Sequence, residues 1–73
     1  MIYELWEVET GNIIGDYQTE LAALEAVREV VHANGESAVK TWVLMRADRR
    51  GHSKALDSGF ELARRATRNA VAR

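Results

Sequence analysis

Residues 2–8 alternate with the two-residue period of a β-strand. Both sides of this strand carry apolar side chains. Gly11 can adopt the left-handed backbone conformation that closes a short hairpin. Residues 13–17 then form the return strand. The two sides of the first strand are occupied by Tyr3 and Leu5, and by Ile2, Trp6 and Val8. We therefore expect an N-terminal β-hairpin.

From Leu21 onward the apolar period changes to three or four residues, which is typical of an amphipathic helix. Thr19 is a favourable N-cap, and Asn34-Gly35 ends the pattern as a helix C-cap does. The pattern predicts a helix over residues 20–33. A second helix, with a thinner apolar stripe, is expected over residues 59–70.

The longest strand-like run lies between these helices, at residues 38–46. Because it is apolar on both alternating sides, it predicts a central strand that is buried on each face. One side carries Val39, Val43 and Met45, and the other carries Trp42 and Leu44. We expect the first side to meet the first helix together with Tyr3 and Leu5. We expect the second side, together with Trp6, to meet the second helix or another copy of the chain.

A polar turn that ends at Gly51 connects this strand to a weaker one at residues 52–56. The element order is therefore β-β-α-β-β-α. It predicts a two-layer α+β fold: a four-stranded antiparallel sheet with one main helix on one face, and a C-terminal helix. Residues 1–73 are expected to form a single domain.

The chain is short, so its own core is expected to leave it only marginally stable. It has no cysteine, which closes the disulfide route to extra stability. Self-association remains, and we expect a homodimer or higher assembly. We expect neither a signal peptide nor a membrane span, and the default location is the cytoplasm.

Two apolar side chains of unusual size bear on that association, Trp6 and Trp42. If they share a sheet face with Leu44, they form an apolar patch that a monomer rarely leaves exposed. The expected interface consists of Trp6, Trp42, Leu44 and Phe60.

Charge is divided unevenly along the chain. Residues 1–45 carry eight acidic and two basic side chains, whereas residues 46–73 carry eight basic and three acidic ones. The candidates for contact with phosphate or with an acidic partner are Arg46, Arg49, Arg50, Arg64, Arg65 and Arg68. Three interpretations stay open: a nucleic-acid contact, attraction between the two halves within one fold, or attraction between copies.

Catalytic chemistry has little support in the residue pattern. His32 and His52 lie in different elements, without the spacing of a ligand pair. Asp57 and Glu61 are explained by helix capping and the helix dipole. We therefore predict no catalytic residue, no cofactor and no metal, and we expect the protein not to be an enzyme.

The opening Tyr3-Glu4-Leu5-Trp6 and the turn Gly11-Asn12 resemble the start of a group of small bacterial proteins that are frequent in actinobacteria. The likeness continues through Ala26-Val27-Arg28 and returns loosely between residues 41 and 51. Leu21 and Ala22 depart from it, since acidic residues are common there, and so does Trp42, where an aliphatic residue is common. The resemblance implies a bacterial, free-standing domain and carries no activity. The hairpin-helix-strand order is also similar in shape to the small domain of type II antitoxins.

These features together predict a non-enzymatic interaction or regulatory protein, antitoxin-like or accessory. It would act through self-association or through a protein partner. The alternative is a small nucleic-acid-binding protein that uses the basic C-terminal half.

Overall fold

A computed structural model describes the backbone of residues 1–71 and the side chains of residues 1–68. The chain forms strands β1 (Ile2–Glu7) and β2 (Asn12–Tyr17), helix α1 (Glu20–Asn34) and a short 3₁₀ helix, η1 (Glu36–Val39). Strands β3 (Trp42–Ala47) and β4 (Ser53–Ser58) and helix α2 (Gly59–Val71) follow. The predicted β-β-α-β-β-α order is confirmed.

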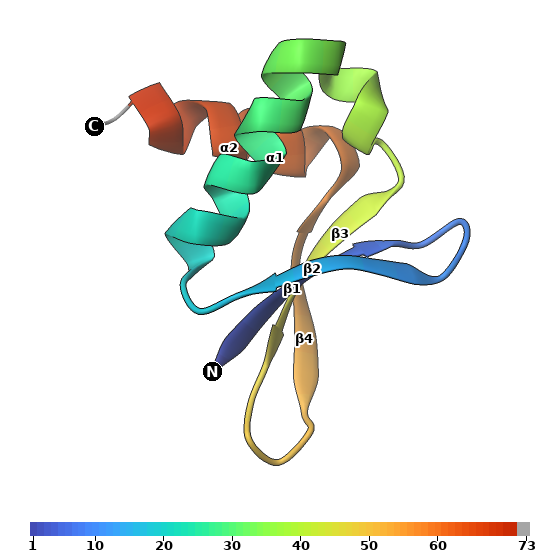
Figure 1. Ribbon diagram of the computed structural model, residues 1–73, viewed down its shortest axis with the longest axis vertical. Coiled ribbons are helices and arrows are strands. Elements are labelled where there is room, and N and C mark those ends of the chain that lie inside the picture. The colour runs from blue at the N-terminus through green and yellow to red at the C-terminus, as the bar shows by residue number, and fades with distance from the viewer. Residues whose placement is uncertain (72–73) are drawn as a thin grey trace.

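The four strands form one antiparallel sheet in the order β2-β1-β3-β4 (Figure 1). The two hairpins are joined through β1 and β3, which pair over the whole length of β1. Both edge pairs contain a β-bulge, at Ile14 in β2 and at Leu56 in β4, where the register shifts by one residue. Bulges increase the local twist of a strand.

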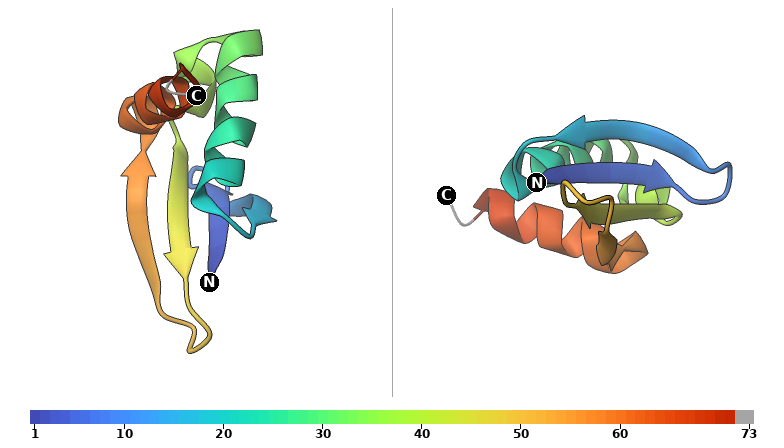
Figure 2. Two further views of the ribbon diagram at one scale, coloured as in Figure 1. Left: turned by 90° about the vertical axis from the view of Figure 1, so that its left-hand side faces the viewer. Right: turned by 90° about the horizontal axis from the view of Figure 1, so that it is seen from below.

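Both helices cover the same face of the sheet. Leu5 of β1 and Leu44 of β3 are directly opposite each other, so they point to the same side, and both are fully buried. The same core includes side chains from α1, η1 and α2. Its fully or almost fully buried members are Leu5, Ala23, Leu24, Val27, Val39, Leu44, Leu62, Ala63 and Ala66. The fold therefore has two layers, one of helices and one of strands (Figure 2).

The first helix begins where the sequence predicts. The hydroxyl oxygen of Thr19 accepts a hydrogen bond from the backbone N–H of Ala22 at 3.0 Å, which satisfies one of the donors left free at a helix start. At the other end, the N–H of Gly35 donates to the carbonyl of Val31 at 2.7 Å. Gly35 has a φ of 90°, and this turns the chain into η1.

The prediction of a strand over residues 38–46 is wrong in its first part, because residues 36–39 form η1 and β3 begins only at Trp42. Val39 is nevertheless fully buried, since it enters the core from the 3₁₀ turn. Two elements therefore contribute to one continuous apolar run. This is why the run looked like a single strand buried on both faces.

The predicted assignment of side chains to the two faces is also wrong. The register places Leu44, with Leu5, under the helices, and it places Val43 opposite Trp6 on the other face. Met45 lies opposite Glu4 and shares that second face. Alternate residues of β1 and β3 point to opposite faces of the sheet. Which residues of the two strands share a face depends on their pairing register, and the pattern of each strand alone does not define that register.

Candidate functional site

Among the residues that the structure describes, no helix packs on the face of the sheet that points away from α1 and α2. In the register of the strands, two rows of four residues cross this face. One row is Ile13, Trp6, Val43 and Ser58, and the next is Asp16, Glu4, Met45 and Ala55. Ile2 opposite Ala47 begins a third row. We call these residues the open face.

Large apolar side chains occupy the middle and the margins of the open face. Ile2 and Ile13 leave 39% and 47% of their surfaces exposed, and Trp6, Val43 and Met45 are half-buried. Contiguous apolar patches of a few hundred Å² on a small protein commonly mark an interaction surface. The apolar side chains of the open face are therefore a candidate interaction surface.

The open face also carries two carboxylates, on Glu4 and Asp16, directly opposite each other on β1 and β2. Like charges in opposite positions destabilise a strand pair. One Glu4 oxygen accepts a hydrogen bond from the indole N–H of Trp6 at 3.2 Å, and this contact orients both side chains. No basic side chain belongs to the rows of this face.

The four residues predicted to form one interface do not share a surface. Trp42 lies opposite Glu7 on the helix side of the sheet and packs against the core, whereas Trp6 lies on the open face. Leu44 is fully buried under the helices and has no accessible surface. Phe60 is on α2 and is 47% exposed. Of the predicted set, only Trp6 belongs to the open face.

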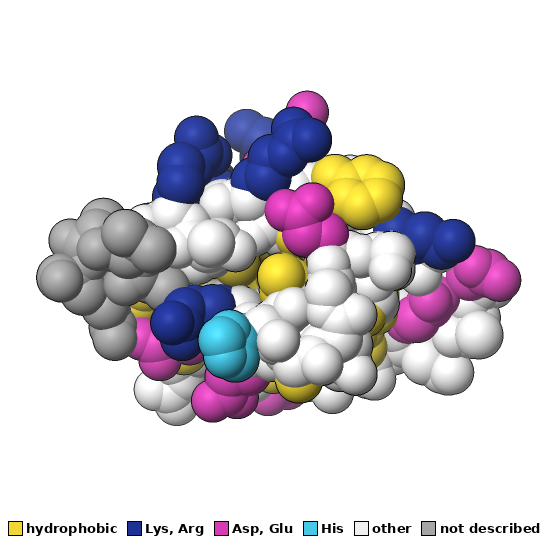
Figure 3. All heavy atoms as spheres, turned by 90° about the horizontal axis from the view of Figure 1, so that it is seen from above, with side chains coloured by type: hydrophobic (Ala, Val, Ile, Leu, Met, Phe, Trp, Pro, Cys, Tyr) yellow, Lys and Arg dark blue, Asp and Glu magenta, His cyan; other side chains and the backbone are white. Residues whose placement is uncertain are grey.

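The arginines predicted to form one basic region lie in two separate places. Arg64, Arg65 and Arg68 are on α2, whereas Arg46, Arg49 and Arg50 are on the β3–β4 hairpin, which extends away from the helices (Figure 1). Seen from the helix end, basic side chains gather along one rim of the molecule (Figure 3).

Arg65 has a structural partner on each side. Its guanidinium contacts the carboxylates of Glu20, in the first turn of α1, and Asp57, at the end of β4. These contacts join both helices to the edge of the sheet. The Glu20 contact also joins the acidic and basic halves of the chain, and it favours the interpretation in which these halves attract each other within the fold.

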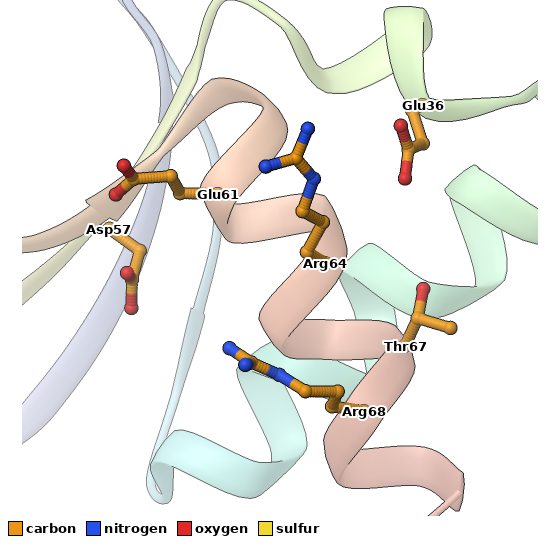
Figure 4. A pocket seen from close by; sticks show the side chains of 6 residues that line it. All are labelled: Glu36, Asp57, Glu61, Arg64, Thr67 and Arg68. Atoms are coloured by element: carbon orange, nitrogen blue, oxygen red, sulfur yellow. The ribbon is translucent and has the colours of Figure 1, made fainter.

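Arg64 and Arg68 line an open depression of about 510 Å³ together with Glu36, Asp57, Glu61 and Thr67. Figure 4 shows Arg64 extending between Glu61 and Glu36, with Arg68 one turn further along the helix. Burial, and secondarily the charge of Glu61, raise the pKa of Asp57, while Arg68 acts in the opposite direction. The depression holds more acidic than basic side chains, so it does not form a basic surface for phosphate.

Glu7 organises the opposite end of the sheet. One of its oxygens accepts from the Thr41 hydroxyl, and the other accepts from the backbone N–H groups of Glu9 and Thr10. The Thr41 hydrogen bond is the main reason that the pKa of Glu7 lies below its ordinary value. This carboxylate holds the β1–β2 turn against the start of β3, and that role accounts for it without catalysis.

The open face is not visible in the residue pattern, because its residues come from four strands whose register the sequence leaves undefined. The alternation of Ile2, Glu4, Trp6 and Val8 was the available signal. It defines one side of β1 but not which residues of β3 lie beside it.

Within the described residues, no group of three or more histidine and carboxylate side chains is placed to hold a metal ion. No described helix is both long and apolar enough to cross a membrane. The chain matches no protein-family model, no curated protein and no solved structure.

Proposed function

We propose that this protein is a non-enzymatic interaction protein that acts through self-association, with the open face as its contact surface. The uncovered apolar centre of that face, formed by Trp6, Val43 and Met45 with Ile2 and Ile13 beside them, is the observation that carries the proposal. An accessory or regulatory role is part of this proposal.

The size of the face supports a weak dimer. Four strands about 4.8 Å apart and six residues long at about 3.3 Å per residue give a footprint of roughly 400 Å² per copy. Specific interfaces typically bury about 800 Å² of accessible surface per partner. Protruding side chains make the accessible surface of the face larger than this flat footprint. The face is still smaller than a typical interface. A face of this size is typical of a weak interface, and we therefore expect a dimer that dissociates reversibly on dilution.

Shape complementarity favours a second copy as the occupant. Aligned sheets pack face to face with their mean strand directions within about 30° of each other. A two-fold axis along the strands, between β1 and β3, places β1 of one copy over β3 of the other. Trp6 then lies over the partner's Val43, and Ile13 over the partner's Ser58, so that large side chains meet small ones. The same axis places the carboxylates of Glu4 and Asp16 over the partner's Met45 and Ala55 and away from each other.

The two sheet edges are less suitable for association than the face. The bulge at Ile14 interrupts β2, and the exposed Lys54 lies on β4. Bulges and lysines on edge strands discourage pairing with another chain. Contact through the face therefore remains the favoured mode.

Sedimentation equilibrium between 1 and 500 µM tests the proposal. We expect reversible dimer formation by the wild type, and at least a 100-fold weaker dimer for Val43→Glu and for Ile13→Glu. Circular dichroism checks that each variant is folded. Phe60→Glu, which adds the same charge on α2, is the control and should dimerise normally. A wild type that is monomeric at 500 µM would refute the proposal, as would a dimer that only Phe60→Glu disrupts.

A further inference from the structure

The β3–β4 hairpin extends beyond the helix layer and forms a separate projection of the molecule (Figures 1 and 2). Four basic side chains belong to it. Arg46 and Lys54 lie on its strands, and Arg49 and Arg50 lie at its turn, where both are exposed. We call these four residues the hairpin cations.

No contact within the described part of the fold balances the charges of the hairpin cations. Arg46 and Lys54 are directly opposite each other on adjacent strands, which is an unfavourable position for two like charges. Within the part of the chain that the structure describes, none of the four takes part in an ion pair. This contrasts with Arg65 on α2, whose charge is balanced by two carboxylates.

The carboxylate at the tip of the hairpin belongs to Asp48, and it accepts hydrogen bonds from the backbone of the turn. One oxygen of Asp48 accepts from the backbone N–H groups of Arg50 and His52, each at 2.9 Å. Its other oxygen lies 3.4 Å from Nδ1 of His52. Gly51, with a φ of 84°, completes the turn. Asp48 thus fixes the backbone that presents Arg49 and Arg50, so less conformational entropy is lost when an anion binds them.

We propose that the hairpin cations bind the phosphate backbone of double-stranded nucleic acid. Guanidinium groups match phosphate oxygens in a two-pronged geometry, and a two-stranded β-ribbon fits the major groove of B-form DNA. Tyr3, the aromatic neighbour of Arg46 in the register, packs against the core. It does not provide a platform for stacked single-strand bases.

The direction of approach is set by the acidic pair on the other side of the sheet. Glu4 and Asp16 are on the open face, where they line a depression that Arg49 also borders. Arg46 and Lys54 point to the helix side, as the register with Tyr3 shows. Nucleic acid therefore approaches from the helix side and the tip. Because the whole chain has a net charge of −1, long-range attraction contributes little, and binding depends on these local contacts.

Fluorescence anisotropy with a labelled 20-base-pair duplex of mixed sequence tests this proposal. Four phosphate contacts predict a slope of about −3.6 for log affinity against log salt, or roughly a 100-fold loss between 50 and 200 mM. The double variant Arg49→Ala/Arg50→Ala should reduce that slope by about 2 and weaken binding at 50 mM salt at least tenfold. Lys54→Gln, on the strand, should reduce the slope by about 1.

The double variant Arg64→Ala/Arg68→Ala removes the same charge from α2 and serves as the matched control. Its duplex affinity should stay within about twofold of the wild type. Equal losses in both double variants, or a loss in the α2 variant alone, would overturn the proposal. So would retention on vesicles containing anionic lipid without binding to the duplex. Duplex binding by the hairpin cations does not require self-association, so Val43→Glu should bind the duplex as the wild type does at concentrations where both are monomeric.

Discussion

Replacing Ile13 by threonine tests the open face with a small change. Ile13 lies on the edge strand β2, directly opposite Trp6, and it leaves 47% of its surface exposed. Threonine keeps the β-branched shape that strands favour and replaces part of the apolar surface with a hydroxyl. Because the side chain is half exposed in the monomer, the variant should lose less than about 1 kcal/mol of folding stability.

The effect on the dimer is larger because the contact occurs twice. Complete burial of an isoleucine side chain stabilises by about 1.5–3 kcal/mol, so covering its exposed half contributes about 1 kcal/mol per copy. A symmetric dimer loses this contribution in both copies, or about 2 kcal/mol in total. That loss corresponds to a dissociation constant raised roughly 30-fold.

Sedimentation equilibrium of wild type and variant measures this ratio directly, and urea unfolding measures the change in folding stability. Phe60→Gln is the matched control, since Phe60 has the same exposed fraction but lies on α2. We expect no change in its dimerisation. Unaltered dimerisation of Ile13→Thr, together with weaker dimerisation of Phe60→Gln, would refute the assignment of the interface to the sheet.

Three further predictions concern the fold. Leu44→Ala should reduce the free energy of unfolding by about 2–5 kcal/mol in urea titrations, because Leu44 is fully buried under both helices; a larger loss for Val43→Ala would contradict the face assignment. Gly59→Ala should lower the free energy of unfolding by about 1–2 kcal/mol in the same assay. Gly59 has a φ of 57°, and an added Cβ would lie 3.2 Å from the carbonyl oxygen of Lys40. Unchanged stability would contradict this backbone geometry. Thr41→Val should lower the free energy of unfolding at neutral pH, and its difference from the wild type should shrink as the pH falls below about 4. The reason is that the lowered pKa of Glu7 stabilises the fold only while that carboxylate is ionised. A pH-independent difference in urea midpoints would exclude this linkage.

Local features of the chain were predictable, whereas their combination was not. The N-cap at Thr19, the first hairpin and the start of α2 at Gly59 each depend on neighbours in the sequence, and each appears where expected. The relation between β1 and β3 depends on the register of two strands nearly forty residues apart. A shift of one residue in that register exchanges the two faces, and this is where the prediction was wrong.

The candidate sites show the same division. The crowding of Arg46, Arg49 and Arg50 near one turn was visible in the sequence, since these residues are close along the chain. The pairing of Arg46 with Lys54 and the engagement of Arg65 by Glu20 and Asp57 depend on tertiary structure. The sequence therefore does not show that Arg65 forms ion pairs within the fold whereas Arg46 lies opposite another cation.

The two tryptophans allow the most direct test of the central claim, that copies of the chain associate through the open face. Trp6 lies on that face and Trp42 lies on the helix side, so the two indole N–H groups report on opposite surfaces of one sheet. In ¹⁵N-labelled protein diluted from 500 to 5 µM, the indole resonance of Trp6 should shift progressively while that of Trp42 stays fixed. A concentration-dependent shift of Trp42 alone, or no shift of either resonance, would contradict the account.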